Sequence, residues 1–193
     1  DELVALARKS AAAGKPLTYG SVGYGSFYHV LGAHFAQTIG AEMVHVPYKG
    51  AAPLLQDMGG DLVDISVLVT GLQSAGLADQ GRLKILGTLA PAGKVEVPFL
   101  KAYPSINDSK SVKGFAYNIW TGYLVRKDTP EPVVQALNKA LTTVLGDPVV
   151  RAELEKQGLM VATPLSVADA AREYETLTTS FRAIAKAITL EAQ

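Results

Sequence analysis

Residues 17–40 read LTYGSVGYGSFYHVLGAHFAQTIG, which is a short apolar run, a glycine-rich turn and a helical stretch in direct succession. Gly40 supplies a stop signal at the end of that helical stretch. One face of the predicted helix consists of Val30, Leu31, His34, Phe35, Thr38 and Ile39. A strand that passes through a tight turn into a helix predicts the first part of a right-handed βαβ unit.

The same order of strand, turn and helix recurs up to residue 90. Further strands are predicted over 43–47, 64–69 and 84–90, with helices over 51–58 and 72–81 between them. Residues 91–114 are rich in Pro, Gly, Lys and Ser and predict a long surface connection. Residues 116–125 predict one more strand. Three helices are then predicted, with start signals at Thr129-Pro130, Asp147-Pro148 and Ser166 with Asp169.

These segments together predict an α/β fold. Its first part is a parallel-rich sheet flanked by helices, and a helical C-terminal segment follows. The 193 residues are 48% hydrophobic and 19% charged, as expected for a globular chain. Eighteen basic residues balance eighteen acidic ones without a basic stripe, so we expect no nucleic-acid partner. The absence of cysteine excludes thiol chemistry and disulfides.

Catalysis has few candidates in this sequence. His29 and His34 lie five residues apart on one predicted helix, so they point in different directions and do not form a metal-binding pair. Ser26 beside His29 is the local pair that could join a nucleophile to a base. Walker, nucleophile-elbow and dinucleotide motifs do not occur. We predict a chain that is not an enzyme and that needs no metal or organic cofactor.

Binding of a small anion has a stronger basis in the turns that follow the strands. The first turn, residues 20–26, contains three glycines and two serines directly before a helix, where backbone N–H groups can approach an anion. The second turn offers the ring and hydroxyl of Tyr48 and the charge of Lys49, and the third offers Thr70. Each turn by itself also fits a purely structural role, with Ser26 as a plain helix cap and Lys49 in solvent.

The convergence of the three turns favours the binding interpretation. Turns at the carboxyl ends of neighbouring parallel strands meet in one crevice, which is where open α/β sheets bind ligands. The predicted ligand-binding residues are Tyr19, Gly20, Ser21, Gly23, Gly25, Ser26, Tyr48, Lys49, Gly50 and Thr70.

A family resemblance follows from several blocks in order along the chain. The first three are residues 19–29 (YGSVGYGSFYH), 44–53 (VHVPYKGAAP) and 60–64 (GDLVD). The similarity continues through 81–86 (GRLKIL) and 147–151 (DPVVR). The chain resembles the Bug-type (TctC-like) receptors of the tripartite tricarboxylate transporters.

The resemblance implies a periplasmic solute receptor of the type II binding-protein class. Two α/β lobes would close on a carboxylate-bearing metabolite, which would then pass to membrane transporter subunits. Residues 1–125 correspond to the ligand-binding lobe two, with 116–125 as a hinge strand. Residues 126–193 correspond to part of lobe one. The third turn departs from the family, which commonly has a polar pair there, whereas this chain has LVTG at 68–71.

Family members usually carry an N-terminal stretch of lobe one before the part that residues 1–193 resemble, and residues 1–9 (DELVALARK) predict a helix and not a signal peptide. We therefore expect weak binding by this chain alone and a homodimer through its C-terminal helices. The apolar face available for such pairing includes Val133, Leu137, Leu141 and Val144. A carboxylate-processing enzyme on a similar fold and a ligand-free interaction domain are the alternative functions.

Overall fold

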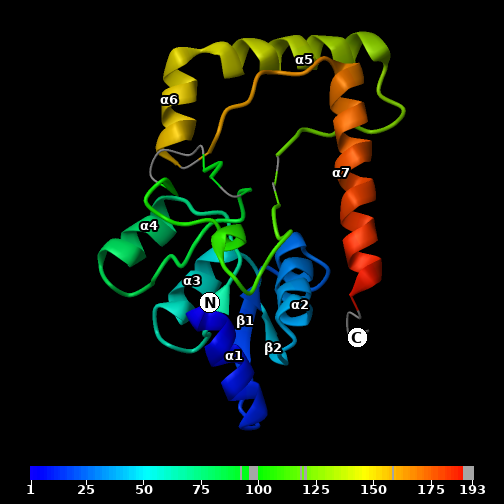
Figure 1. Ribbon diagram of the computed structural model, residues 1–193. Coiled ribbons are helices and arrows are strands. Elements are labelled where there is room, and N and C mark those ends of the chain that lie inside the picture. The colour runs from blue at the N-terminus through cyan, green and yellow to red at the C-terminus, as the bar shows by residue number, and fades with distance from the viewer. Residues whose placement is uncertain (92, 96–99, 118, 120, 158, 189–193) are drawn as a thin grey trace. The chain divides into compact units, whose positions relative to one another are not determined.

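The computed structural model describes residues 1–91, 93–95, 100–117, 119, 121–157 and 159–188 (Figure 1). They fall into two compact units. Unit 1 comprises Asp1–Tyr117 with Ala183–Gln193, and unit 2 comprises Asn118–Arg182. The boundary predicted at residue 125 falls inside unit 2, and the assignment of the two parts to lobes stays a prediction.

The core of unit 1 is a parallel sheet of three strands in the order β2-β1-β3. The central strand β1 is Leu17–Ser21, and its neighbours are β2, Met43–Pro47, and β3, Ile65–Ser66. In the register, Ser21 lies opposite Pro47, and Gly20 lies opposite Ser66. The predicted parallel sheet is therefore confirmed, and its three strands end at one edge.

Helices cover both faces of β1. Helix α2, Phe27–Ile39, packs on the face that carries Tyr19, where a Cβ at Gly32 would overlap the tyrosine ring. Helix α3, Ala51–Met58, packs on the opposite face, where Leu54 lies against Gly20. Helix α1, Glu2–Ala12, joins α2 in the main hydrophobic cluster of Val4, Ala7, Leu31, Phe35, Ile39, Ala41, Val112 and Phe115.

Two predicted strands are wrong and a third is much shorter than expected. The strand predicted over 64–69 is reduced to β3. It starts one residue late, because the Asp64 carboxylate accepts hydrogen bonds from the Thr18 N–H and hydroxyl, both at 2.7 Å, in place of the ladder bonds. The segment 84–90 forms only an isolated bridge between Thr88 and Ser105. The described residues of 116–125 form no strand; positions 118 and 120 lie outside the described residues.

The connection after the sheet is better ordered than its composition predicted. Helix α4, Leu72–Asp79, precedes it, and a 3-10 helix, η2, spans Ile106–Asp108. Asn107 donates from Nδ2 to Ala90 O (3.1 Å) and Phe115 O (3.2 Å), and its Oδ1 accepts from Phe115 N–H (2.8 Å). One amide side chain therefore joins three points of the connection.

Unit 2 is helical, as predicted. It holds α5, Glu131–Gly146, α6, Pro148–Lys156, and most of α7, Val167–Ala187. Asp147 caps α6 by accepting the N–H groups of Val149 and Val150, and Ser166 Oγ accepts the Asp169 N–H at the start of α7. The start signal at Thr129-Pro130 predicted Thr129 as the cap of this helix and Pro130 in its first turn, which is wrong by one residue, because Pro130 is the N-cap of α5.

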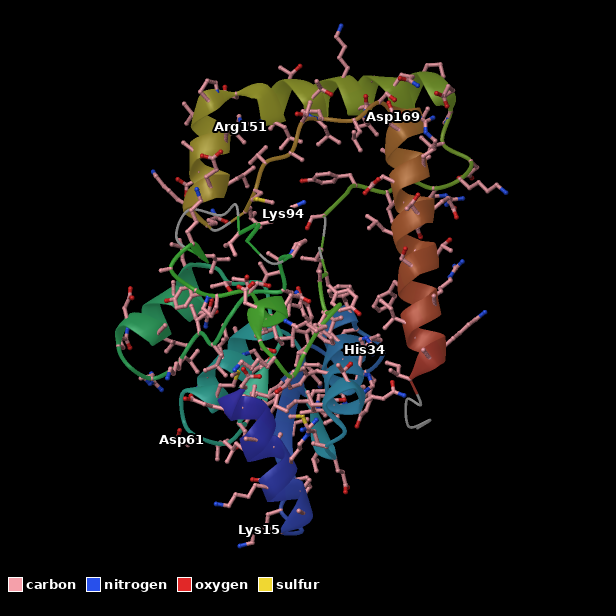
Figure 2. All side chains as sticks on the ribbon, in the orientation of Figure 1. Lys15, His34, Asp61, Lys94, Arg151 and Asp169 are labelled. Carbon is pink, nitrogen blue, oxygen red and sulfur yellow. The ribbon has the colours of Figure 1, made fainter. Side chains whose placement is uncertain are left out.

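The apolar side chains on α5 remain open to solvent in unit 2. Val133, Leu137 and Val144 are 47%, 45% and 49% exposed. The Arg151 guanidinium (labelled in Figure 2) donates to Leu145 O at 3.1 Å and Val161 O at 2.8 Å. These two bonds join α6 to the end of α5 and to the connection between α6 and α7.

Candidate functional site

The candidate site is the edge of the sheet at which β1, β2 and β3 end. Because Ser21 is in register with Pro47 and Gly20 with Ser66, the three following turns begin side by side. The Tyr48 N–H donates to Ser21 O at 2.9 Å and joins the first turn to the second. Ser66 Oγ donates to Gly20 O at 2.9 Å and joins β1 to β3 at the point where the third turn begins. The three strands therefore end at one edge of the sheet, as predicted. A crevice formed by the turns and ligand contact by these residues stay predictions.

The first turn uses several of its own backbone donors. Gly23 N–H donates to Ser21 Oγ (3.2 Å), Gly25 N–H to His29 Nδ1 (3.0 Å), and Ser26 N–H to Gly23 O (3.3 Å). Gly23 and Gly25 have φ angles of 132° and 70°, which side-chain-bearing residues rarely adopt. The expectation that these N–H groups are free for an anion is therefore corrected: in this conformation they hold the turn itself.

Ser26 is the cap of α2, as its structural interpretation expected. Its Oγ accepts the His29 N–H at 3.2 Å. The contact that could have activated Ser26 as a nucleophile therefore goes to the histidine backbone. The His29 ring nitrogen Nδ1 instead accepts the Gly25 N–H, so it is not a base for Ser26.

A cluster of aromatic rings lies directly behind the first turn. The imidazoles of His29 and His45 stack with centroids 3.8 Å apart and an interplanar angle of 11°. Tyr19 stacks on His45 at 5.0 Å, and the Tyr24 ring meets His45 edge-on at 5.0 Å. Ser21 Oγ lies 2.7 Å from His45 Nε2 and is fully buried, so no substrate reaches this hydroxyl.

Burial favours the uncharged form of both imidazoles of this pair. Desolvation lowers the pKa of His29. Desolvation, and then the charge of His29, lower the pKa of His45 to about 4. Sequence reasoning missed this pair because His29 and His45 belong to different elements, α2 and β2. His34 points elsewhere, as predicted, and stacks on Phe115 at 5.2 Å.

The second turn contains one side chain that is bonded within the protein, Tyr48, and one that is exposed to solvent, Lys49. The Tyr48 hydroxyl donates to Asp57 Oδ2 at 2.8 Å, so the predicted hydroxyl contact already has a protein partner. Lys49 is exposed. Gly50 is the N-cap of α3 with φ 127°, and no side chain in the described part of the chain caps this helix. Of the two helices that follow the first and second turns, α2 has a side-chain cap and α3 has none within the residues that the structure describes, so the N–H groups at the start of α3 have fewer partners within the protein.

The third turn differs in one residue from its prediction. The N-cap of α4 is Gly71, not Thr70, which precedes it. Ser74 Oγ accepts the Gly71 N–H and donates to Gly71 O, both at 3.0 Å. Thr70 is only partly exposed, and Val69 beside it is 41% exposed.

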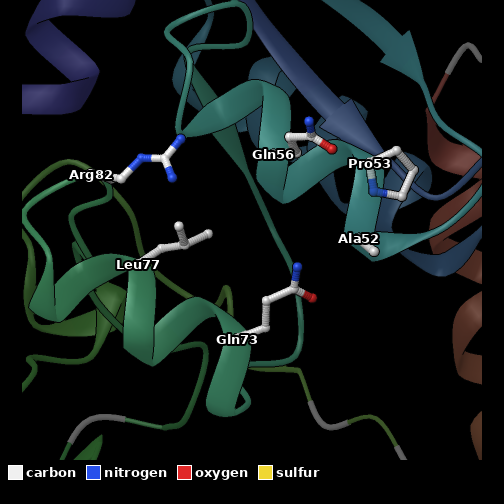
Figure 3. Close-up of a pocket in the computed structure, with 6 residues that line it drawn as sticks. All are labelled: Ala52, Pro53, Gln56, Gln73, Leu77 and Arg82. Carbon is white, nitrogen blue, oxygen red and sulfur yellow. The ribbon is translucent and has the colours of Figure 1, made fainter.

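An open groove of about 430 Å³ lies between α3 and α4 (Figure 3). None of the predicted binding residues lines it. Its Arg82 side chain donates from Nη2 to Gly59 O at 3.1 Å. We place the candidate site at the turns, because the groove is wide and bordered mainly by exposed side chains: Ala52, Pro53, Gln56, Gln73, Leu77 and Arg82.

The described residues contain no group of three or more His, Asp or Glu side chains that could hold a metal ion. Within the same residues, no helix is both long enough and apolar enough to cross a membrane.

Comparison with known proteins places the chain in a family. A family model described as "Tripartite tricarboxylate transporter family receptor" matches residues 1–188. A UPF0065 protein of Agrobacterium vitis, from the TAR-I ttuE-ttuC' intergenic region, is 29% identical over 149 residues, 77% of this chain and 41% of that protein. The chain thus spans less than half of that relative.

Solved structures agree with this assignment. R. palustris Rpa4515, solved with adipate, has a TM-score of 0.79 and 26% identity, over 96% of this chain and 59% of that chain. The periplasmic binding protein BugD has a TM-score of 0.78 and 26% identity, over 96% and 60%. These similarities confirm the predicted fold class. With its three convergent turns and a family match over residues 1–188, the chain belongs to the tripartite tricarboxylate transporter family receptors.

Proposed function

We propose that this chain forms the carboxylate-binding lobe of an extracytoplasmic solute receptor, with the ligand at the three turns. The observation that carries the proposal is the register of β1 with β2 and β3, which brings three strand-to-helix turns to one edge. Family membership and the adipate held by Rpa4515 support a carboxylate as the ligand class.

The local chemistry of the second turn suits a carboxylate better than that of the first. The start of α3 lacks a side-chain cap among the described residues, and helix N-termini attract anions. Lys49, at the same turn, adds an exposed positive charge. The first turn then supplies shape, because Gly23 and Gly25 keep side chains away from the approach.

The proposal extends to location and partners. A receptor of this family would act in the periplasm, where BugD is described as a binding protein, and would deliver its ligand to a membrane transporter. A second lobe would complete the enclosure of the ligand, so this chain alone should bind weakly. We propose no reaction on the ligand, since Ser26 and His29 are not arranged as nucleophile and base.

A pair of glycine variants tests the site. Gly14 and Gly25 have φ angles of 71° and 70°, and an added Cβ would meet no atom within 4 Å at either position. Gly14→Val and Gly25→Val therefore introduce the same backbone strain, about 1–2 kcal/mol, at two places. Titration with millimolar adipate, followed by amide chemical shifts, should move residues 49–52 in the wild type and in Gly14→Val. These shifts should disappear in Gly25→Val.

Circular dichroism controls for folding in both variants. The proposal fails if a folded Gly25→Val protein responds to adipate as the wild type does. It also fails if carboxylates from two to eight carbons long produce no shift at the turns at any concentration.

A further inference from the structure

Two imidazoles stand directly behind the first turn, and each is bonded to a residue of that turn. His29 is 6% exposed and accepts the Gly25 N–H through Nδ1 at 3.0 Å. His45 lies 2.7 Å through Nε2 from the fully buried Ser21 Oγ. The rings stack at 3.8 Å, so the two bonds and the stack form one connected unit.

These contacts define the charge state of the His29 ring. A nitrogen that accepts an N–H carries no proton, so the single ring proton of His29 lies on Nε2 and the imidazole is neutral. A proton added at Nδ1 would point toward the Gly25 N–H and break this hydrogen bond.

The His45 ring leads to the same conclusion by a different route. Its Nδ1 is buried and has no hydrogen-bond partner in the described part of the chain. The charged ring would therefore hold a buried N–H without an acceptor, which is costly. Two charged rings stacked at 3.8 Å would also repel each other.

Charged neighbours do not compensate such a proton. The titratable groups whose rings face the pair are Tyr19, from β1, and Tyr24, from the turn. The carboxylate of Asp57, on α3, is bonded to the Tyr48 hydroxyl, and that of Asp64, before β3, is bonded to Thr18. On α1, Arg8 donates to Ile39 O, and Glu2 and Lys9 are exposed. Glu42, before β2, and Lys49, after it, are also exposed.

We propose that His29 and His45 are positioning residues of the first turn, which they hold in its binding form only while both rings are neutral. Neither ring needs to touch the ligand. The effect on ligand binding rests on the proposed function, whereas the effect on the turn does not.

The direction of the pH dependence follows from the two protonation states. The folded pKa of His45 is about 4, below the ordinary value of 6.5, so the unfolded or opened state binds the proton more tightly. The closed turn is fully favoured above pH 6.5 and loses this advantage as the pH falls toward about 4. Desolvation of His29 acts in the same direction.

Two substitutions at one position separate positioning from mere packing. His29→Asn keeps a side-chain oxygen that can accept the Gly25 N–H but cannot take up a proton in this range. His29→Leu removes the acceptor. His34→Asn is the matched control, because His34 (labelled in Figure 2) lies on the same helix as His29. Its ring stacks on Phe115 and does not support the turn.

Nuclear magnetic resonance on the whole chain reads the turn without any ligand. Amide exchange at Gly25 should be about tenfold faster in His29→Leu than in the wild type, and unchanged in His29→Asn and His34→Asn. The Gly25 amide shift of the wild type should move between pH 6.5 and 4 together with the imidazole resonances, and it should move less in His29→Asn, where only His45 is left to titrate. A ring of His29 that titrates at 6.5 without moving the Gly25 signal would overturn the proposal.

A second measurement connects the turn to binding. Adipate affinity should fall more steeply between pH 7.5 and 5 in the wild type than in His29→Asn, by about tenfold in the ratio of the two proteins. The ratio cancels the protonation of adipate itself. Equal losses in both proteins would overturn the role in binding. If neither protein binds adipate at pH 7.5, the proposed function fails, and the exchange data still decide the role of the histidines in the turn.

Discussion

At Gly20, strand β1 lies in close contact with helix α3. A Cβ built on Gly20 would overlap Leu54 Cδ1 and lie 3.2 Å from Cδ2. Leu54 is completely buried, so its side chain has little room to move away. The glycine is therefore required by packing, in contrast to Gly25, whose surroundings are open and whose φ angle is the constraint.

Alanine substitutions at two glycines should have opposite effects on stability. Gly20→Ala should lower the free energy of unfolding by about 1–3 kcal/mol, because the added methyl overpacks the β1–α3 contact. Gly76→Ala, inside α4 with no atom within 4 Å, should raise it by about 0.5–1 kcal/mol through helix propensity. Urea unfolding followed by circular dichroism measures both. An equal effect of the two substitutions would contradict this account of Gly20.

Among the elements, the strand-to-helix units were the most predictable part of the chain. The bounds of β2 and α3 match the predicted ranges, and β1 extends one residue beyond the predicted 17–20, because their apolar runs end in glycine or proline signals that lie within a few residues. Residues 84–90 were predicted as a strand from their apolar pattern. In the structure this segment pairs only through one isolated bridge, between Thr88 and Ser105, and the pattern does not show how many residues will find a partner.

The candidate site was predictable in its location and not in its internal bonding. Parallel strand order already implied that turns such as those at Gly25 and Lys49 share an edge. The stacking of His29 on His45 depends on the strand register and on the docking of α2, which local sequence does not encode. The bonds that occupy the N–H groups of Gly23 and Gly25 are local, to Ser21 and His29, but they depend on a turn conformation that the glycine-rich composition does not specify.

The stability of the connection around the 3-10 helix η2 depends on the side chain of Asn107. Asn107→Ala should lower the free energy of unfolding by about 2 kcal/mol, because it leaves the N–H and C=O of Phe115 and the C=O of Ala90 without this partner. Asn138→Ala, which removes one exposed bond to Leu165 O, should cost about 0.5 kcal/mol. Thermal unfolding gives the stabilities, and faster amide exchange at Phe115 should accompany only the first change. Equal losses would show that the Asn107 network is not cooperative.

For the molecule as a whole, the exposed side of α5 is the feature that bears on association. Its residues Val133, Leu137 and Val144 are each exposed by nearly half, and apolar groups at helical spacing form a surface that another chain can cover. The homodimer expected from the sequence therefore stays a prediction with a defined surface.

Two glutamate substitutions on α5 test this association. Leu137→Glu puts a charge on the apolar side, whereas Gln135→Glu puts the same charge two residues away, on a different side of the helix. Light scattering from micromolar to millimolar protein should show the wild type and Gln135→Glu associating as the concentration rises. Leu137→Glu should shift the midpoint of association upward by about tenfold or more. A monomeric wild type over the whole range would disprove the association.

The packing of β1 between Leu54 and the imidazole pair divides the residues of the candidate site into two groups: buried residues that support the turns, and exposed residues at the turns. Gly20 and Ser21 each support a buried contact behind the turns, so a change there disturbs several elements at once. Lys49 and Val69 are exposed, so a change at either residue disturbs no buried contact of this kind. New ligand preferences can therefore evolve, or be selected from a mutant library, by substitution of the exposed residues Lys49 and Val69, while the buried residues Gly20 and Ser21 stay unchanged.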